Sequence, residues 1–369
     1  MSSPIYLESL PTELLNEVLL KLSTDPPSTS KLQDGLIDTI TKSETRALKQ
    51  VSLTSSRFLG LVRPLLFKHA RFDLKDKDEF LSFIKRHGLD PHVESIVVSG
   101  REMNADWCDP FWWRPVLREL NPQRLVIVAT PFLLGNMFCT RIATHHSRAF
   151  DNQLQVLQLE QKNTSVRDRS IIPPEPPTGH KNLFSARPWA SLSFNENSSL
   201  KGYDRYEYFL TRFPSVFERW GAMASVRLGR SGDLPEPLLS FSLLTSFHYM
   251  AVFPYYTHVM TVLDAVETMT NLRFLSVQLA PGKNDKILEE EQRGSMDSND
   301  PWMEVLTGYS MIAHTVMQIG QKWKLERFQS RDYELEALKS GLDTIAADVL
   351  TVSGWVHDGH GTWNKVKAN

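Results

Sequence analysis

Residues 7–22, LESLPTELLNEVLLKL, carry the strongest apolar helical pattern near the start of the chain. Pro11 suits the first turn of a helix, because its missing N–H would have no intrahelical partner there. The apolar side chains cover two adjoining faces of the predicted helix, more than a single packing seam requires; they are Leu10, Leu14, Leu15, Val18, Leu19 and Leu22. We therefore expect this helix to offer part of its apolar surface to a partner.

A second apolar segment, residues 47–72, continues the helical spacing. Leu48, Val51 and Leu53 lead into a predicted break at residues 54–56, after which Phe58 opens another helical stretch. Pro64 is tolerated near the start of a helix. The two segments together predict three short helices.

These residues resemble an F-box of the type common in fungal proteins. The resemblance rests on three groups of residues in this order along the chain: Leu10-Pro11-Thr12-Glu13-Leu14-Leu15, then Leu48, Val51, Leu53 and Arg57-Phe58, then Arg63-Pro64-Leu65-Leu66-Phe67. The resemblance implies a three-helix F-box over residues 1–75 that binds a Skp-type adaptor and, through it, a cullin. It also implies a set of apolar adaptor contacts: Leu10, Pro11, Leu14, Leu15, Val18, Leu48, Val51, Phe58 and Leu65.

The segment at residues 23–45 departs from that family because it is longer than the usual connection between the first two helices. Its Ser, Thr, Pro and Asp content predicts a surface loop. An alternative for residues 7–72 is an ordinary helical bundle packed on the rest of the chain.

From residue 76 onward, short β-branched runs alternate with helical stretches. The strand candidates share the pattern apolar-x-x-apolar-x-apolar and centre on Ile96, Leu125, Leu157, Val226, Phe247, Leu275, Phe328 and Leu350. Most of the steps between successive central residues are close to the leucine-rich-repeat period of roughly 20–29 residues. We therefore predict an α+β to α/β protein whose residues 76–369 form a leucine-rich-repeat-like solenoid; an irregular α/β domain without true repeats is the alternative.

Two polar segments interrupt the predicted repeats, at residues 160–203 and 281–300. The first begins as a Pro-rich loop and ends in an aromatic stretch that is too apolar for plain disorder. Long loops on a rigid scaffold often carry binding residues. We select Trp189, Phe194 and Tyr203 as candidate substrate contacts.

The sequence gives no pattern for catalysis, cofactor binding or metal binding. It contains no GxSxG, P-loop or GxGxxG motif. His145-His146 and the pair His357 and His360 have no Cys or acidic residue at a zinc-binding spacing, and the second pair is expected in a turn. We predict neither an enzyme nor a metal or cofactor site.

The composition bounds the class of protein. Lys and Arg number 41 against 43 Asp and Glu, which disfavours nucleic acid or anionic lipid as a partner. No apolar stretch is long enough for a membrane span. Two cysteines, Cys108 and Cys139, do not make a disulfide framework. We expect a soluble protein of the cytoplasm, the nucleus or both.

The resemblance implies that the protein is the substrate-recognition subunit of an SCF-type (Skp–cullin–F-box) ubiquitin ligase, with the downstream domain binding an unknown substrate protein. Two alternatives stay open at this point. One is an F-box protein that acts in a complex without a cullin, and the other is an unrecognised enzyme in residues 76–369.

Overall fold

The computed structural model describes residues 7–23, 45–101, 109–138, 142, 149–150, 154–162, 183–212, 215–219, 241–282, 297 and 299–366. Its strands are β1 (His69–Asp73), β2 (Ser95–Ser99), β3 (Arg124–Ala129), β4 (Gln155–Gln161), β5 (Trp189–Ser198), β6 (Ser246–Val252), β7 (Phe274–Gln278), β8 (Arg327–Ser330), β9 (Trp355–His357) and β10 (Thr362–Lys365).

The α-helices are α1 (Thr12–Leu20), α4 (Arg46–Ser52), α5 (Ser56–Lys68), α6 (Lys77–Arg86), α7 (Trp113–Glu119), α8 (Pro131–Met137), α10 (Tyr206–Thr211), α12 (Tyr256–Val266), α14 (Asp300–Lys322) and α15 (Glu336–Ile345). Short 3-10 helices span Leu7–Ser9, Leu74–Asp76, Asp90–His92, Leu183–Ser185, Leu200–Arg205 and Val216–Arg219, and a π-helix spans Ala346–Thr351.

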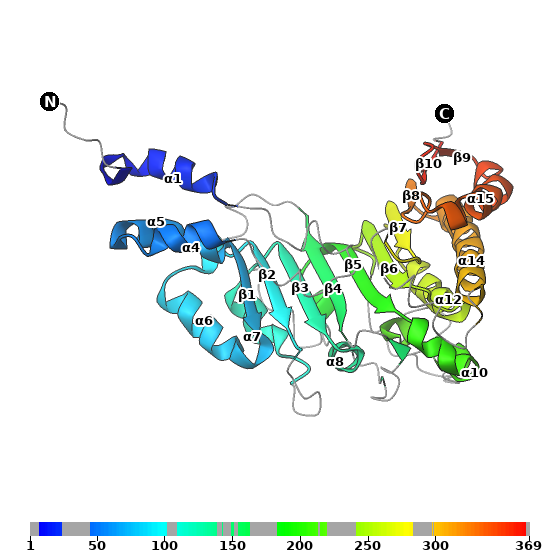
Figure 1. Ribbon diagram of the computed structural model, residues 1–369, viewed down its shortest axis with the longest axis horizontal. Helices are drawn as coiled ribbons and strands as arrows, with labels where there is room; N and C mark the ends of the chain where they lie inside the picture. The colour runs from blue at the N-terminus through cyan, green and yellow to red at the C-terminus, as the bar shows by residue number, and fades with distance from the viewer. Residues whose placement is uncertain are drawn as a thin grey trace.

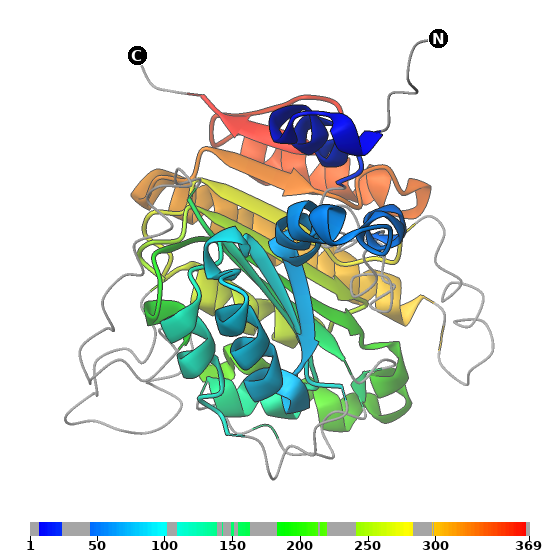
Figure 2. The same cartoon turned by 90° about the vertical axis from the view of Figure 1, so that its left-hand side faces the viewer.

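The described strands form one ten-stranded mixed sheet in the order β1-β2-β3-β4-β5-β6-β7-β8-β10-β9 (Figure 1). Most neighbouring pairs are parallel, with helices in the connections, which is an α/β arrangement. Strand β4 is antiparallel to both β3 and β5, and β10 is antiparallel to β8 and β9. Figure 2 looks at the end of the sheet where β1 lies.

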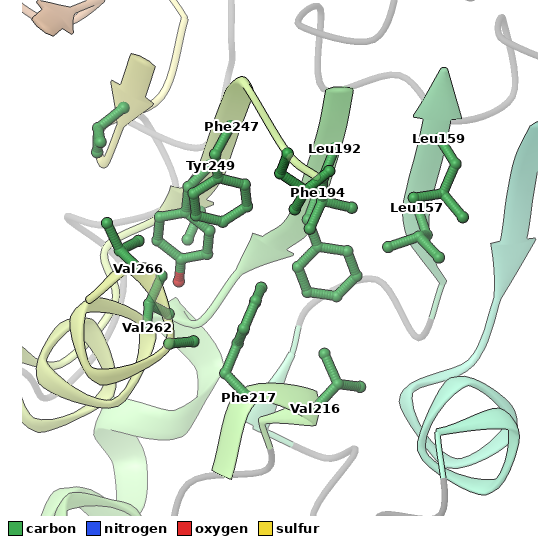
Figure 3. Packing of buried hydrophobic residues seen from close by; sticks show 14 of the residues in the cluster. Leu157, Leu159, Leu192, Phe194, Val216, Phe217, Phe247, Tyr249, Val262 and Val266 are labelled. Carbon is green, nitrogen blue, oxygen red and sulfur yellow. The ribbon is translucent and has the colours of Figure 1, made fainter. Parts of the chain in front are cut away.

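One large apolar core lies between the sheet and the helices α7, α8, α12 and α14. Alternate residues of each strand point into it, because successive side chains of a strand face opposite sides. Phe194 on β5 meets Phe217 edge-on with ring centroids 5.3 Å apart, and Tyr249 on β6 lies beside Val262 of α12 (Figure 3). We call the sheet surface on the other side, away from this core, the second face.

The described N-terminal helices correct the predicted fold class. A separate three-helix F-box is not formed: α5 ends at Lys68 and β1 begins at His69, so the helical segment runs directly into the sheet. The physical reason is the pairing of β1 with β2, which places Ala70 and Phe72 in the core of the sheet. The proposed division at residue 75 stays a prediction.

The predicted leucine-rich-repeat solenoid is also wrong. Its repeats would put every strand in the same direction, whereas β4 is reversed within a continuous mixed sheet. Six strand candidates do lie on strands, centred on Ile96, Leu125, Leu157, Phe247, Leu275 and Phe328. The candidate around Leu350 lies in the π-helix instead, and the arrangement agrees with the alternative of an irregular α/β domain.

Several sequence predictions lie outside the described residues. They are most of the segment 23–45, the strand candidate at Val226, both cysteines, His145-His146, and large parts of the two polar segments. Within the described part, residues 189–198 of the first polar segment form β5. No described helix combines the length and the apolar character that a membrane span requires.

Candidate protein-docking surfaces

Among the described residues, helix α1 packs through one side only. Leu15 and Leu19 are buried against Leu48 of α4 and against Phe58 and Val62 of α5. These five side chains form an apolar cluster of their own, apart from the main core. The spacing of four residues between Leu15 and Leu19 places both on the same side of the helix. The other sides of α1 therefore face away from α4 and α5.

Exposed large apolar side chains are concentrated in and around α1. Leu14 is 48% exposed and Val18 is 47% exposed, and they also lie four residues apart on α1. We call the exposed apolar residues of this region the N-terminal apolar surface: Leu7, Leu14, Val18, Leu20, Leu22 and Leu53. They are six of the eleven exposed large apolar residues in the described chain, so the enrichment is local. Exposed apolar side chains gathered in this way are typical of an interaction site.

Arg57 on α5 holds the beginning of α1 in place. Its guanidinium donates hydrogen bonds to the carbonyl oxygens of Glu8 and of Leu10, the second at 2.9 Å, and it lies 3.4 Å from the Thr12 hydroxyl. Pro11, with φ −53° and ψ 148°, turns the chain into the helix directly after these carbonyls. The Leu10-Pro11 turn and α5 are thus fixed to one another.

The predicted adaptor contacts divide into three groups by exposure. Pro11, Leu14 and Val18 are exposed and accessible to a partner. Leu10, Val51 and Leu65 are half-buried against the small cluster of α1, α4 and α5.

The remaining predicted contacts, Leu15, Leu48 and Phe58, are buried inside that cluster. These three support the surface from beneath, and a partner can reach only the first two groups directly. Arg57 was not among the predicted contacts, although it stands next to Phe58 in the same motif.

The predicted substrate contacts lie inside the main core. The Trp189 indole N–H donates to the carbonyl of Leu183, Phe194 is fully buried, and Tyr203 stacks on Tyr255 with ring centroids 4.8 Å apart. The three do not form a common surface, and a substrate could touch them only if their neighbours moved. Their role in substrate binding stays a prediction.

The second face carries polar and basic side chains over β6, β7 and β8. His248 lies 2.8 Å from the Ser246 hydroxyl, and the Arg331 Nε donates to Ser276 at 3.1 Å. The Arg327 guanidinium lies 4.1 Å from the centre of the Phe274 ring. Burial, aided by the two arginines, lowers the pKa of His248 to about 4, so the imidazole is neutral near pH 7.

Three buried carboxylates join strands and helices in the core. Glu196 accepts from the Tyr249 hydroxyl at 2.6 Å and lies 2.8 Å from His258 Nε2. Asp332 is the second of these carboxylates. It accepts from the Tyr309 hydroxyl and the Leu279 amide, both at 2.5 Å.

The third, Glu304, accepts from the Tyr206 hydroxyl at 2.5 Å and from the Tyr256 amide at 2.6 Å. Each carboxylate is satisfied by fixed donors of the protein, which is typical of structural groups.

Burial raises the pKa of Asp332 to about 7, against the lowering effect of its hydrogen bonds. The histidines of the C-terminal hairpin are engaged locally: His357 accepts from the Gly361 amide at 3.0 Å and stacks on Trp363. Of the two histidines expected in a turn, His360 lies in the connection between β9 and β10, whereas His357 is the last residue of β9. Across the described residues, no three His, Cys, Asp or Glu side chains gather as metal ligands would.

Comparisons with protein-family models, with curated proteins and with solved structures each found no match to this chain. The resemblance of residues 10–67 to an F-box therefore stays a prediction from the sequence.

Proposed function

We propose that this chain is the substrate-recognition subunit of an SCF-type ubiquitin ligase and binds a Skp-type adaptor through the N-terminal apolar surface. The observation that carries the proposal is the exposure of Leu14 and Val18 on a helix whose opposite side is already buried. Both residues belong to the segment that resembles an F-box. The proposal requires only that a partner can reach this surface. It does not require a separate F-box domain, so it is compatible with α5 running directly into β1.

The size of the surface is compatible with a specific complex. Complete burial of one Leu or Val side chain is worth about 1.5–3 kcal/mol, and the side chains of Leu14 and Val18 are about half exposed. Several of them together therefore offer a few kcal/mol, and the half-buried Leu10, Val51 and Leu65 add to the rim. A handful of central residues commonly dominates the affinity of such interfaces.

The mechanism would be positional. A bound adaptor and cullin place a substrate on this chain near the ubiquitin carrier, which raises the effective concentration of the reacting groups. The chain itself needs no catalytic residue for this role.

Co-expression with a fungal Skp-type adaptor tests the proposal. Size-exclusion chromatography should show a one-to-one complex with the full chain, and the double variant Leu14→Ala/Val18→Ala should lose it. Val352 and Val356 are exposed at the other end of the described chain, so Val352→Ala/Val356→Ala is the matched control and should keep the complex. Equal recovery of adaptor with both double variants contradicts the proposed surface.

The complex should then recruit a cullin. Adding a cullin to the purified pair should give a ternary complex that elutes earlier. A stable pair that excludes the cullin would instead support the alternative of an F-box protein that acts without one.

A further inference from the structure

Two arginines on the second face of the sheet form no ion pair with the described residues. Arg327 begins β8 and Arg331 follows its end, and both lie on the second face because Phe328 between them packs in the core. The exposed guanidinium of Arg327 lies 4.1 Å from the centre of the Phe274 ring. The half-buried guanidinium of Arg331 donates from Nε to the Ser276 hydroxyl. Most N–H groups of the two guanidiniums are therefore left without an acceptor from the described chain.

Both arginines lean from β8 onto the neighbouring strand β7. Phe274 and Ser276, which they contact, lie two positions apart on β7 and therefore roughly 7 Å apart along the strand. The His248 imidazole on β6 is level with Ser276 in the sheet and meets the Phe274 ring edge-on, with ring centroids 5.1 Å apart. The Ser246 hydroxyl, 2.8 Å from Nε2, can donate to it and so place the imidazole proton on Nδ1. Two guanidiniums and one imidazole N–H thus surround the same stretch of β7.

This grouping is electrostatically costly without a counter-charge. The positive charges of both arginines add to burial in lowering the pKa of His248 to about 4. Asp332 acts on the charge of Arg331, yet its carboxyl lies in the core with a pKa of about 7 and carries only part of a negative charge near neutral pH. An anion bound between the guanidiniums would offset their repulsion.

We propose that Arg327, Arg331 and His248 bind the phosphate group of a small phosphorylated molecule. A phosphate monoester is close to doubly negative at neutral pH and offers three strong acceptor oxygens. Guanidinium groups match phosphate geometry and form charge-assisted hydrogen bonds with it. The two cations balance its charge, and the imidazole N–H supplies a further donor.

The position of the site favours a small molecule over a peptide. Strands β6, β7 and β8 are interior strands with a paired neighbour on each side, so their backbone groups are used within the sheet. A peptide that binds by strand addition needs an exposed sheet edge, and these strands offer none. The site lies toward the other end of the sheet from α1 (Figure 1), and the proposal does not depend on the ligase function.

The test is calorimetric titration of the full chain at constant ionic strength and about pH 8, where a phosphate monoester is doubly charged. The probes are methyl phosphate, its singly charged analogue methyl sulfate, and the acetylated and amidated peptide Gly-Ala-phosphoserine-Ala-Gly. Methyl phosphate should bind at millimolar concentration and methyl sulfate more weakly. The peptide should bind no more tightly than methyl phosphate. Tighter binding of the peptide would identify a phosphorylated protein as the ligand and overturn the proposal, as would no binding of methyl phosphate.

Three protein variants locate the binding. Arg327→Gln removes an exposed guanidinium and should weaken methyl phosphate about tenfold, and Arg331→Gln should give a similar loss. Arg86→Gln removes an exposed guanidinium from α6 and should change the affinity less than about twofold. Equal affinities in Arg327→Gln and Arg86→Gln would refute the site.

Urea denaturation gives a second readout. Without phosphate, Arg327→Gln should leave the free energy of unfolding unchanged or raise it, because a repelling charge is removed. Saturating methyl phosphate should stabilise the wild type more than this variant, since a ligand stabilises the folded state in proportion to its affinity for that state. Equal stabilisation of both proteins would contradict binding at Arg327.

Discussion

The Arg57 Nη2 atom on α5 donates a hydrogen bond to the Leu10 carbonyl at 2.9 Å, which ties the start of α1 to a helix 47 positions later in the chain. Together with its bond to the Glu8 carbonyl, this contact fixes the turn that leads into the exposed side of α1. The N-terminal apolar surface thus depends on a polar anchor as well as on the buried Leu15 and Leu19.

The substitution Arg57→Ala should loosen α1 without disturbing the sheet. Hydrogen bonds from a charged donor are worth about 1.5–3 kcal/mol where they are shielded and less at an exposed site such as this one. We expect faster hydrogen–deuterium exchange in residues 12–20 and unchanged exchange in the strands. Lys49→Ala on α4 is the control, and equal exchange in both variants would contradict the anchoring role.

The ionisation of Asp332 should make stability depend on pH. Burial raises the pKa of its carboxyl from an ordinary value of 3.8 to about 7 in the folded chain, so the folded state binds the proton more tightly than the unfolded chain does. The free energy of unfolding contributed by the protonated carboxyl is full below about pH 4 and is lost as the pH rises to about 7. Asp332→Asn should flatten this decline, measured by urea denaturation at several pH values; an unchanged slope would contradict the assignment.

His248 should act in the opposite direction. Its pKa is lowered from 6.5 to about 4, so the unfolded chain binds the proton more tightly. Stability from this residue is therefore full above about pH 6.5 and falls as the pH is lowered to about 4. His248→Gln should remove that loss relative to the wild type. Comparison of each variant with the wild type separates His248 from Asp332, and a wild-type slope retained in His248→Gln would count against the buried neutral imidazole.

Two glycines in helices should respond in opposite ways to alanine. A Cβ on Gly320 of α14 would lie 2.7 Å from Cζ2 of the buried Trp355, so Gly320→Ala should cost about 1–3 kcal/mol of unfolding free energy. A Cβ on Gly60 of α5 meets nothing within 4 Å, so Gly60→Ala should gain up to about 1 kcal/mol. Denaturant titration of both variants measures these changes in the free energy of unfolding. An unchanged free energy of unfolding in Gly320→Ala would show that Trp355 can shift freely.

Local patterns predicted much of the secondary structure and little of the topology. The alternation around residues such as Ile96 and Leu275 found six strands, because each is short, apolar and bounded by polar residues. Strand β5 lies in the polar segment 160–203, which was predicted to begin as a Pro-rich loop and to end in an aromatic stretch. The end of the strand, NENS, is polar, yet these side chains are buried. The reversal of β4 depends on pairing that no local pattern shows.

The candidate sites also divide into features that local sequence patterns show and features that depend on contacts between residues distant in the chain. Leu14 and Val18 are among the adaptor contacts that the F-box resemblance implies, and both side chains are about half exposed. The anchor at Arg57 joins residues distant in the chain, so it could not be read from spacing.

The most direct test of the proposed ligase role is hydrogen–deuterium exchange of the full chain with and without a fungal Skp-type adaptor. We expect slower exchange on adaptor binding in residues 12–20 and in α4 and α5, with little change in β5 to β10. Protection confined to the sheet, or no protection anywhere at saturating adaptor, would contradict docking through Leu14 and Val18.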